Sequence, residues 1–145
     1  MTLVRPLTKD DHLAWRRMWT AYLEFYETTV SEEVYDTLWE RLHSEDSNEF
    51  NGLIAEVNGN PVGLTHYLFH RHGWKVENCC YLQDLYVDPE VRGTGAGRAL
   101  IEAVYAEADA AGAPSVYWLT QEFNYTARQL YDRVAQKTPF IRYNR

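Results

Sequence analysis

The feature that most constrains the fold of this chain is a glycine-rich turn between a strand-like segment and a helix-like segment. Residues 79–87 are almost continuously apolar or aromatic, which is typical of a strand buried on both faces. The turn follows at residues 92–98, and apolar residues then recur at helical spacing from Leu100 to Ala108. A strand that enters a helix through glycines leaves the first helix amides unpaired, so we expect the turn to bind phosphate or pyrophosphate.

Two common nucleotide motifs do not fit the glycine spacing. A dinucleotide fingerprint, Gly-x-Gly-x-x-Gly, started at Gly93 ends on Arg98, and started at Gly95 it ends on Leu100. A P-loop started at Gly93 also needs glycine where Arg98 stands. A nucleotide-dependent redox enzyme is therefore disfavoured, whereas Arg92 and Arg98 still suit a phosphate ligand.

Length and charge limit the classes of function. A chain of 145 residues with 46% hydrophobic and 14% aromatic residues is expected to form one globular domain over residues 1–145. With 21 acidic and 14 basic side chains, the formal net charge is −7. This sign argues against nucleic acid as the main partner and favours a cationic ligand.

No apolar run is long enough to span a bilayer, and residues 1–6 do not resemble a signal peptide, so we expect a cytoplasmic protein without membrane attachment. The adjacent Cys79 and Cys80 point to opposite strand faces and suit neither a disulfide nor a zinc site. His70 and His72 lack an evident third ligand, so no metal is expected.

The rest of the chain is predicted to form further strands and helices. Asn58-Gly59 predicts a tight antiparallel hairpin. The other expected elements are strands at 3–5, 53–57, 61–69, 116–120 and 139–143, and helices at 8–26, 32–43 and 124–135. Together they predict an α/β (α+β) fold.

Separate motifs in this chain agree with one enzyme family. Residues 92–97 resemble the acetyl-coenzyme A signature Arg/Gln-x-x-Gly-x-Gly/Ala of the GNAT N-acetyltransferase superfamily. Asn124, Ala127 and Leu130-Tyr131 are similar to that superfamily's later Asn-x-x-Ala-x-x-Leu-Tyr element. Residues 81–87 resemble the diamine and polyamine acetyltransferase branch, and the ending from Tyr131 resembles short histone/polyamine acetyltransferase-like members.

This resemblance implies a mixed, mostly antiparallel central sheet flanked by helices, with pantetheine between the strands that end at Val87 and Thr120. It also implies no bound metal and a homodimer formed near the last strand. The acetyl-CoA contacts that it implies are Leu85, Tyr86, Val87, Arg92, Gly93, Thr94, Gly95, Ala96, Gly97, Arg98, Asn124 and Tyr131.

Acetyl transfer to an amine needs a base, since an alkylammonium has a pKa of about 10.4. The resemblance makes Tyr131 the acid for the departing thiolate. Gln83 stands where polyamine-type relatives typically carry Glu, and an amide is no base. Asp84 is the neighbouring carboxylate, either as base or as a structural or ammonium-binding group. A water chain from Tyr81, Glu122 or a backbone carbonyl is the alternative.

Glutamates surround the break between the first two helices, a region that resembles the acceptor-binding part of the family. Individually they suit a solvated face, but collectively they indicate a cationic acceptor. Glu24, Glu27 and Asp84 are the predicted substrate-binding residues. The aromatic stripe on the first helix is expected to be mainly core: Trp15, Trp19, Tyr22 and Tyr26.

These observations predict an N-acetyltransferase that moves acetyl directly from acetyl-CoA to a primary amine of a small cationic, diamine- or polyamine-like acceptor. An acetyltransferase for lysine or the N-terminus of a protein or peptide is the alternative. Because Gln83 stands in place of a carboxylate, a third interpretation is a non-catalytic acyl-CoA-binding sensor or interaction module.

Overall fold

The computed structural model describes residues 1–145 and contains one five-stranded sheet with the order β1-β2-β3-β4-β5. Neighbouring strands from β1 to β4 are antiparallel, and β5 is parallel to β4. The predicted mixed, mostly antiparallel sheet is therefore confirmed. The strands are β1 (Thr2–Pro6), β2 (Asn51–Val57), β3 (Asn60–His70), β4 (Cys79–Val87) and β5 (Val116–Tyr117).

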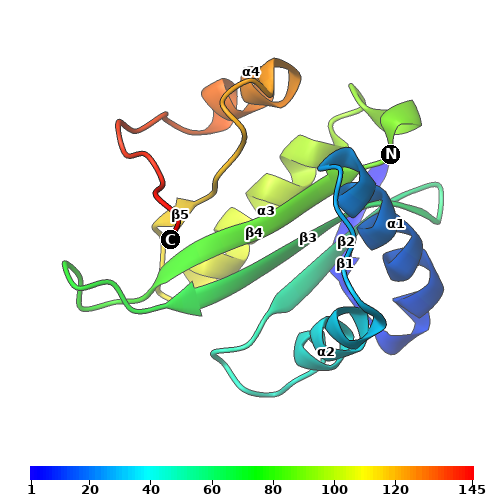
Figure 1. Ribbon diagram of the computed structural model, residues 1–145, viewed down its shortest axis with the longest axis horizontal. Helices are drawn as coiled ribbons and strands as arrows, with labels where there is room; N and C mark the ends of the chain where they lie inside the picture. The colour runs from blue at the N-terminus through cyan, green and yellow to red at the C-terminus, as the bar shows by residue number, and fades with distance from the viewer.

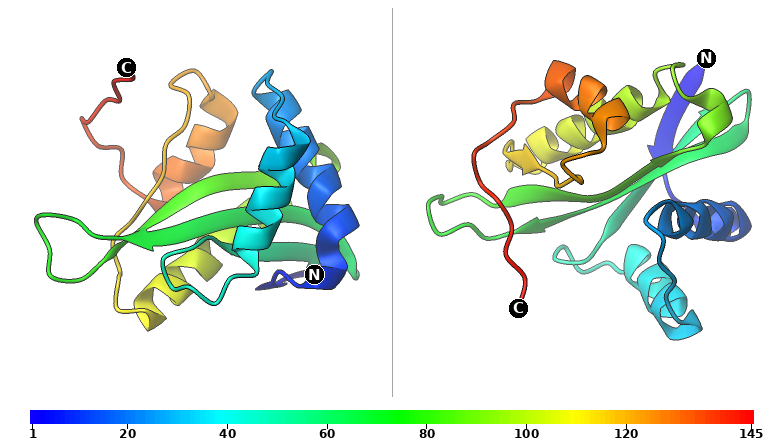
Figure 2. Two further views of the ribbon diagram at one scale, coloured as in Figure 1. Left: turned by 60° about the horizontal axis from the view of Figure 1, so that its bottom comes forward. Right: turned by 45° about the horizontal axis from the view of Figure 1, so that its top comes forward.

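Helices cover both faces of the sheet. In Figures 1 and 2, α1 and α2 lie on one face, whereas α3 lies on the other and α4 stands beyond the β4 edge on the α3 side. The helices are α1 (His12–Phe25), α2 (Glu32–Leu42), α3 (Ala96–Ala110) and α4 (Tyr125–Val134), with short turns η1 (Lys9–Asp11) and η2 (Pro89–Val91). None of the helices is both long and apolar enough to cross a membrane.

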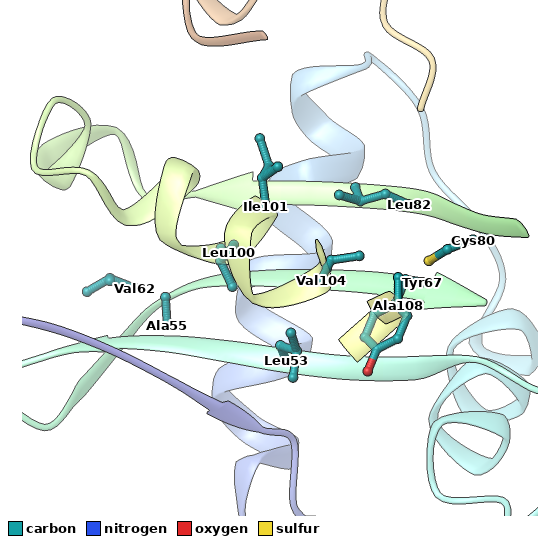
Figure 3. Close-up of a cluster of buried hydrophobic side chains, with 10 residues drawn as sticks. All are labelled: Leu53, Ala55, Val62, Tyr67, Cys80, Leu82, Leu100, Ile101, Val104 and Ala108. Atoms are coloured by element: carbon teal, nitrogen blue, oxygen red, sulfur yellow. The ribbon is translucent and has the colours of Figure 1, made fainter. Parts of the chain in front are cut away.

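The α3 side of the sheet contains one buried apolar cluster, drawn in Figure 3. The α3 residues recur at helical spacing and pack on side chains from β2, β3 and β4. The cluster consists of Leu53, Ala55, Val62, Tyr67, Cys80, Leu82, Leu100, Ile101, Val104 and Ala108.

The opposite face contains a second cluster, built mainly from the aromatic side of α1. Trp15 and Trp19 are buried, as predicted, and Tyr22 packs against them from a half-buried position. Ser31 caps α2 through its side chain, which accepts a hydrogen bond from the Val34 amide. The aromatic stripe therefore packs α1 against the part of the sheet formed by β3 and β4.

The predicted hairpin between β2 and β3 is confirmed. Asn58 and Gly59 both have positive φ, 52° and 80°, as a two-residue type I′ turn requires. Asparagine tolerates this conformation and glycine adopts it without strain, so the dipeptide sets the turn.

Two predicted strands differ from the structure: one is shorter than expected and the other does not form. β5 covers only Val116–Tyr117 instead of extending to Thr120, because its ladder with β4 ends at Tyr117. Residues 139–143 form no strand, although their composition favours one. A strand needs a hydrogen-bonded neighbour, and no sheet edge of this chain pairs with this exposed segment.

Gly63 permits the close approach of β3 to β4, which yields a stability prediction. A Cβ at Gly63 would lie 2.8 Å from the Tyr86 carbonyl oxygen and 3.2 Å from Leu100 Cδ1. Gly63→Ala is therefore expected to lower the free energy of unfolding by about 1–3 kcal/mol through overpacking. Urea unfolding measures this loss. Gly73→Ala is the control, since nothing lies within 4 Å of a Cβ there. Equal urea midpoints for the two variants would show that a Cβ at residue 63 is accommodated without overpacking.

Candidate active site

A β-bulge in β4 decides where Asp84 points. His66 pairs with Asp84, but the next residue, Tyr67, pairs with Leu82, so Gln83 has no partner on β3. Leu82 consequently packs in the α3-side cluster, whereas Asp84 turns to the α1 side. Gln83 itself is exposed. The bulge therefore places a carboxylate on the inner face of an otherwise apolar strand.

Asp84 is buried and hydrogen-bonded to His66, which is in turn hydrogen-bonded to Trp15, and the sequence did not indicate either contact. His66 Nδ1 lies 2.9 Å from Asp84 Oδ2, and the indole Nε1 of Trp15 donates to His66 Nε2 at 3.0 Å. The three residues are 6%, 1% and 0% exposed, respectively. A single histidine within an apolar strand was the only sequence signal for this arrangement.

Tyrosine side chains connect Asp84 with α4. Burial, and after it the negative charge of Asp84, raises the pKa of both Tyr22 and Tyr26. Burial, and after it the proximity of Tyr26, raises the pKa of Tyr131 to about 12. Tyr131 packs edge-on against Trp118, with ring centroids 5.4 Å apart. Neighbouring side chains thus lead from Asp84 of β4 through Tyr26 at the end of α1 to Tyr131 of α4.

Beyond its first residues, β4 has an open backbone edge. Only Cys80 and Tyr81 pair with β5, through Val116 and Tyr117. Residues 82–87 have no strand neighbour on that side, and Figure 1 shows α4 standing beyond this edge. Leu85, Tyr86 and Val87, predicted to contact pantetheine, lie along this open edge. Their backbone groups are placed where an extended ligand can pair with them.

The glycine turn ends in a set of unpaired amides. Gly93 and Gly95 have φ of 86° and 90°, which L side chains rarely adopt, and Gly95 is the N-cap of α3. The first α3 hydrogen bond runs from the Ala99 amide to the Gly95 carbonyl at 2.9 Å. The amides of residues 96–98 therefore precede the helical ladder at its positive end, which suits an anion.

Gly97 serves packing rather than turn geometry. A Cβ there would lie 3.3 Å from Leu130 Cδ2 of α4 and 3.7 Å from Val87 Cγ2 of β4. The start of α3, the end of β4 and α4 thus meet around this glycine. Both arginines of the turn are exposed: Arg92 lies over the Phe25 ring at 5.9 Å, and Arg98 Nε pairs with Glu102 at 2.8 Å.

Other predicted site residues lie apart from Asp84. Glu24 is exposed on the outer side of α1, where it borders a surface hollow together with Arg16 and Arg17. Asn124 is the N-cap of α4, and its Nδ2 donates to Thr120 Oγ1 at 3.2 Å. The structure therefore places Glu24 on the exposed surface, whereas Asp84, the other predicted substrate-binding residue, is buried.

Glu27 is also exposed, and it ends α1 in an unusual backbone conformation. Its φ is 55°, while the Thr28 amide donates to the Leu23 carbonyl at 3.0 Å and the Glu27 amide to Glu24 at 2.9 Å. This is a Schellman helix end, whose left-handed position is usually glycine.

Replacing Glu27 by glycine is expected to stabilise the protein. Relief of the left-handed strain exceeds the added unfolded-state entropy, for a net gain of about 0.5–1 kcal/mol. The free energy of unfolding from urea titration checks this gain. Glu27→Ala removes the same carboxylate but keeps a Cβ, so it should give no gain. A similar gain from both variants would assign the effect to the lost charge instead.

Comparisons with known proteins agree with the fold and the motifs. A family model described as acetyltransferase (GNAT) family matches residues 15–135. The D-amino-acid N-acetyltransferase HPA3 of Saccharomyces cerevisiae is 38% identical over 144 residues, covering 99% of this chain and 89% of that protein. The thialysine N-epsilon-acetyltransferase of Bos taurus is 33% identical over 90 residues, covering 57% of this chain and 52% of that protein.

Among solved structures, the aminoglycoside N-acetyltransferase AAC(6')-Iy in complex with CoA superposes with a TM-score of 0.83 at 17% identity. The match covers 100% of this chain and 94% of that chain. At this identity the match establishes a shared fold.

Proposed function

Because this chain belongs to the acetyltransferase (GNAT) family, we propose that it transfers acetyl directly from acetyl-CoA to a primary amine of a small cationic, diamine- or polyamine-like acceptor. One observation carries the proposal. The open edge of β4 belongs to the strand that carries Asp84, and the start of α3, with its unpaired amides, and α4, which carries Tyr131, both approach the end of this strand around Gly97. Residues 1–145 would act as one domain.

The residues around this edge fit acetyl-CoA. The positive end of α3 suits its pyrophosphate, and the unpaired backbone of residues 85–87 suits the amides of its pantetheine arm. Gly93 and Gly95 leave open space where a Cβ would stand, which allows a close backbone approach. When bound, acetyl-CoA supplies the thioester carbonyl carbon that the acceptor nitrogen attacks.

The protein's own groups manage two protons. Asp84 takes one proton from the ammonium form of the acceptor, and the freed nitrogen lone pair forms the new C–N bond as the C–S bond breaks. The acylated nitrogen then loses its second proton to solvent, which leaves a neutral amide. The hydroxyl of Tyr131 donates its hydrogen to the departing sulfur. Because burial raises the pKa of Tyr131 to about 12, this phenol is protonated at neutral pH and available as a donor. Solvent then restores both groups.

Two kinds of acceptor compete in this proposal. The formal net charge of −7 and the buried carboxylate of Asp84 favour a cationic amine. The 38% identity to a protein named D-amino-acid N-acetyltransferase favours an amino acid as the second candidate. Gln83, exposed on the bulge, is not positioned by any hydrogen bond to act on either.

An acceptor panel tests the proposal through thiol release from acetyl-CoA. The panel contains an aliphatic diamine, a polyamine, a D-amino acid, thialysine and a lysine-containing peptide. We expect the highest kcat/KM with the diamine or polyamine. A higher kcat/KM with the D-amino acid or the peptide would overturn the acceptor class. Binding of acetyl-CoA without turnover of any amine would favour an acyl-CoA sensor instead.

We further propose a homodimer and a cytoplasmic location. The exposed apolar side chains of the last residues, Phe140, Ile141 and Tyr143, support a contact with a second copy. Two unpaired, buried thiols, Cys79 and Cys80, suit a reducing compartment.

A further inference from the structure

A chain of hydrogen bonds on the α1 face joins three polar side chains from different elements. Trp15 of α1 donates through Nε1 to His66 Nε2 of β3, and His66 Nδ1 lies within hydrogen-bond distance of Asp84 Oδ2 of β4. All three are at least nine-tenths buried. Burying a polar group without a hydrogen-bond partner costs free energy, so the loss of either hydrogen bond would leave a buried polar group unpaired.

The two hydrogen bonds of His66 determine which of its ring nitrogens carries the hydrogen. An indole N–H donates and never accepts, so His66 Nε2 must present its lone pair to Trp15. The ring hydrogen is then on Nδ1 and is donated to Asp84. His66 is therefore a neutral imidazole of one tautomer, and it accepts no proton unless the bond from Trp15 breaks.

Trp15 is itself held by packing. It is fully buried, with its ring centroid 4.9 Å from Trp39 and 6.3 Å from Tyr35 in an edge-on contact. The indole hydrogen consequently points in a fixed direction, and the geometry of His66 and then of Asp84 follows from it.

We propose that Trp15 and His66 are positioning residues for acetyl transfer: the Trp15 indole holds His66 as the neutral Nδ1–H tautomer, which fixes the carboxylate of Asp84. This inference rests on the proposed function of Asp84. Asp84 accepts the proton from the acceptor amine, and His66 does not. The other titratable groups facing Asp84 are Tyr22 and Tyr26 of α1 and Tyr81 of β4, beside which Arg142 lies.

Trp15→Phe removes the indole donor and keeps an aromatic ring. We expect kcat/KM to fall about fivefold to tenfold, the effect of one lost neutral hydrogen bond. His66 Nε2 becomes free to bind a proton, so the pH profile should gain an acidic limb that the wild-type protein lacks.

Trp19→Phe is the matched control. Trp19 lies one turn along α1, is also buried, and its indole nitrogen has no hydrogen-bond partner. The Trp19 ring packs edge-on against His66, with centroids 5.2 Å apart, but makes no hydrogen bond to it, so the same substitution there removes similar ring volume and leaves the hydrogen bond from Trp15 in place. An acidic limb in both variants, or in neither, would overturn the proposal.

Nitrogen-15 NMR of the histidines in the wild-type protein gives a readout that does not depend on turnover. We expect His66 to show a protonated Nδ1 and an unprotonated Nε2 at neutral pH, as its two hydrogen bonds require. A doubly protonated ring or the opposite tautomer would overturn the proposal even in an active enzyme. The expected tautomer in a protein without turnover would support the positioning chain and count only against the proposed function.

Discussion

Replacing Tyr131 by phenylalanine is expected to lower kcat for acetyl transfer by about 100-fold, the usual contribution of a positioned acid. Phenylalanine keeps the ring contact with Trp118 and removes only the hydroxyl that protonates the sulfur. Acetyl-CoA affinity should therefore be unchanged. Thiol-release kinetics measure kcat, and calorimetric titration of acetyl-CoA measures the affinity.

A second tyrosine provides the control for this result. The Tyr105 hydroxyl donates to the Val134 carbonyl at the end of α4, 2.9 Å away, so Tyr105→Phe removes one hydrogen bond that supports α4. We expect this variant to lose about 1 kcal/mol of stability and little kcat. An unchanged kcat in Tyr131→Phe would show that Tyr131 is not the acid. An equal loss in both variants would show that α4 placement, not acid chemistry, limits the rate.

Replacing Asp84 by asparagine is expected to lower kcat/KM at neutral pH by roughly 100-fold to 1000-fold, within the range for loss of a general base. The Asn oxygen still accepts the hydrogen bond from His66 Nδ1, so the Trp15 chain and the fold are retained. Only the negative charge is lost.

The pH dependence distinguishes the two roles open to Asp84. Without a base the variant depends on amine that is already neutral, so its kcat/KM should rise about tenfold per pH unit below the acceptor pKa of about 10.4. A raised KM with unchanged kcat would instead make Asp84 an ammonium-binding group. Asp132→Asn, on the exposed side of α4, makes the same charge change and should leave the kinetics unaltered.

Local signals in the sequence predicted much of the fold. Asn58-Gly59 specified the hairpin turn, Ser31 the start of α2, and the glycines after Asp88 the entry to α3. Each of these features depends on residues that are neighbours along the chain. The length of β5 and the missing strand after Pro139 depend on whether a hydrogen-bonding neighbour is present, which local composition does not encode.

The candidate site was predictable where it follows motifs and not where it depends on distant partners. The turn from Gly93 to Arg98 and the placement of Tyr131 on α4 follow the sequence pattern. Trp15 and His66 are 51 residues apart, and no local pattern links them. The bulge at Gln83 shifts the register by one residue, and it exchanges the faces that simple alternation assigns to the following side chains.

The central claim is that the turn at residues 93–98 and the open edge of β4 form one acetyl-CoA site, and chemical-shift mapping tests it most directly. Titration of CoA into the nitrogen-15-labelled protein should shift the amides of Gly95, Ala96, Gly97 and Arg98 most strongly, together with those of Leu85 and Val87. Shifts confined to α2 or to the outer side of α1 around Glu24, with residues 93–98 unchanged, would contradict the account.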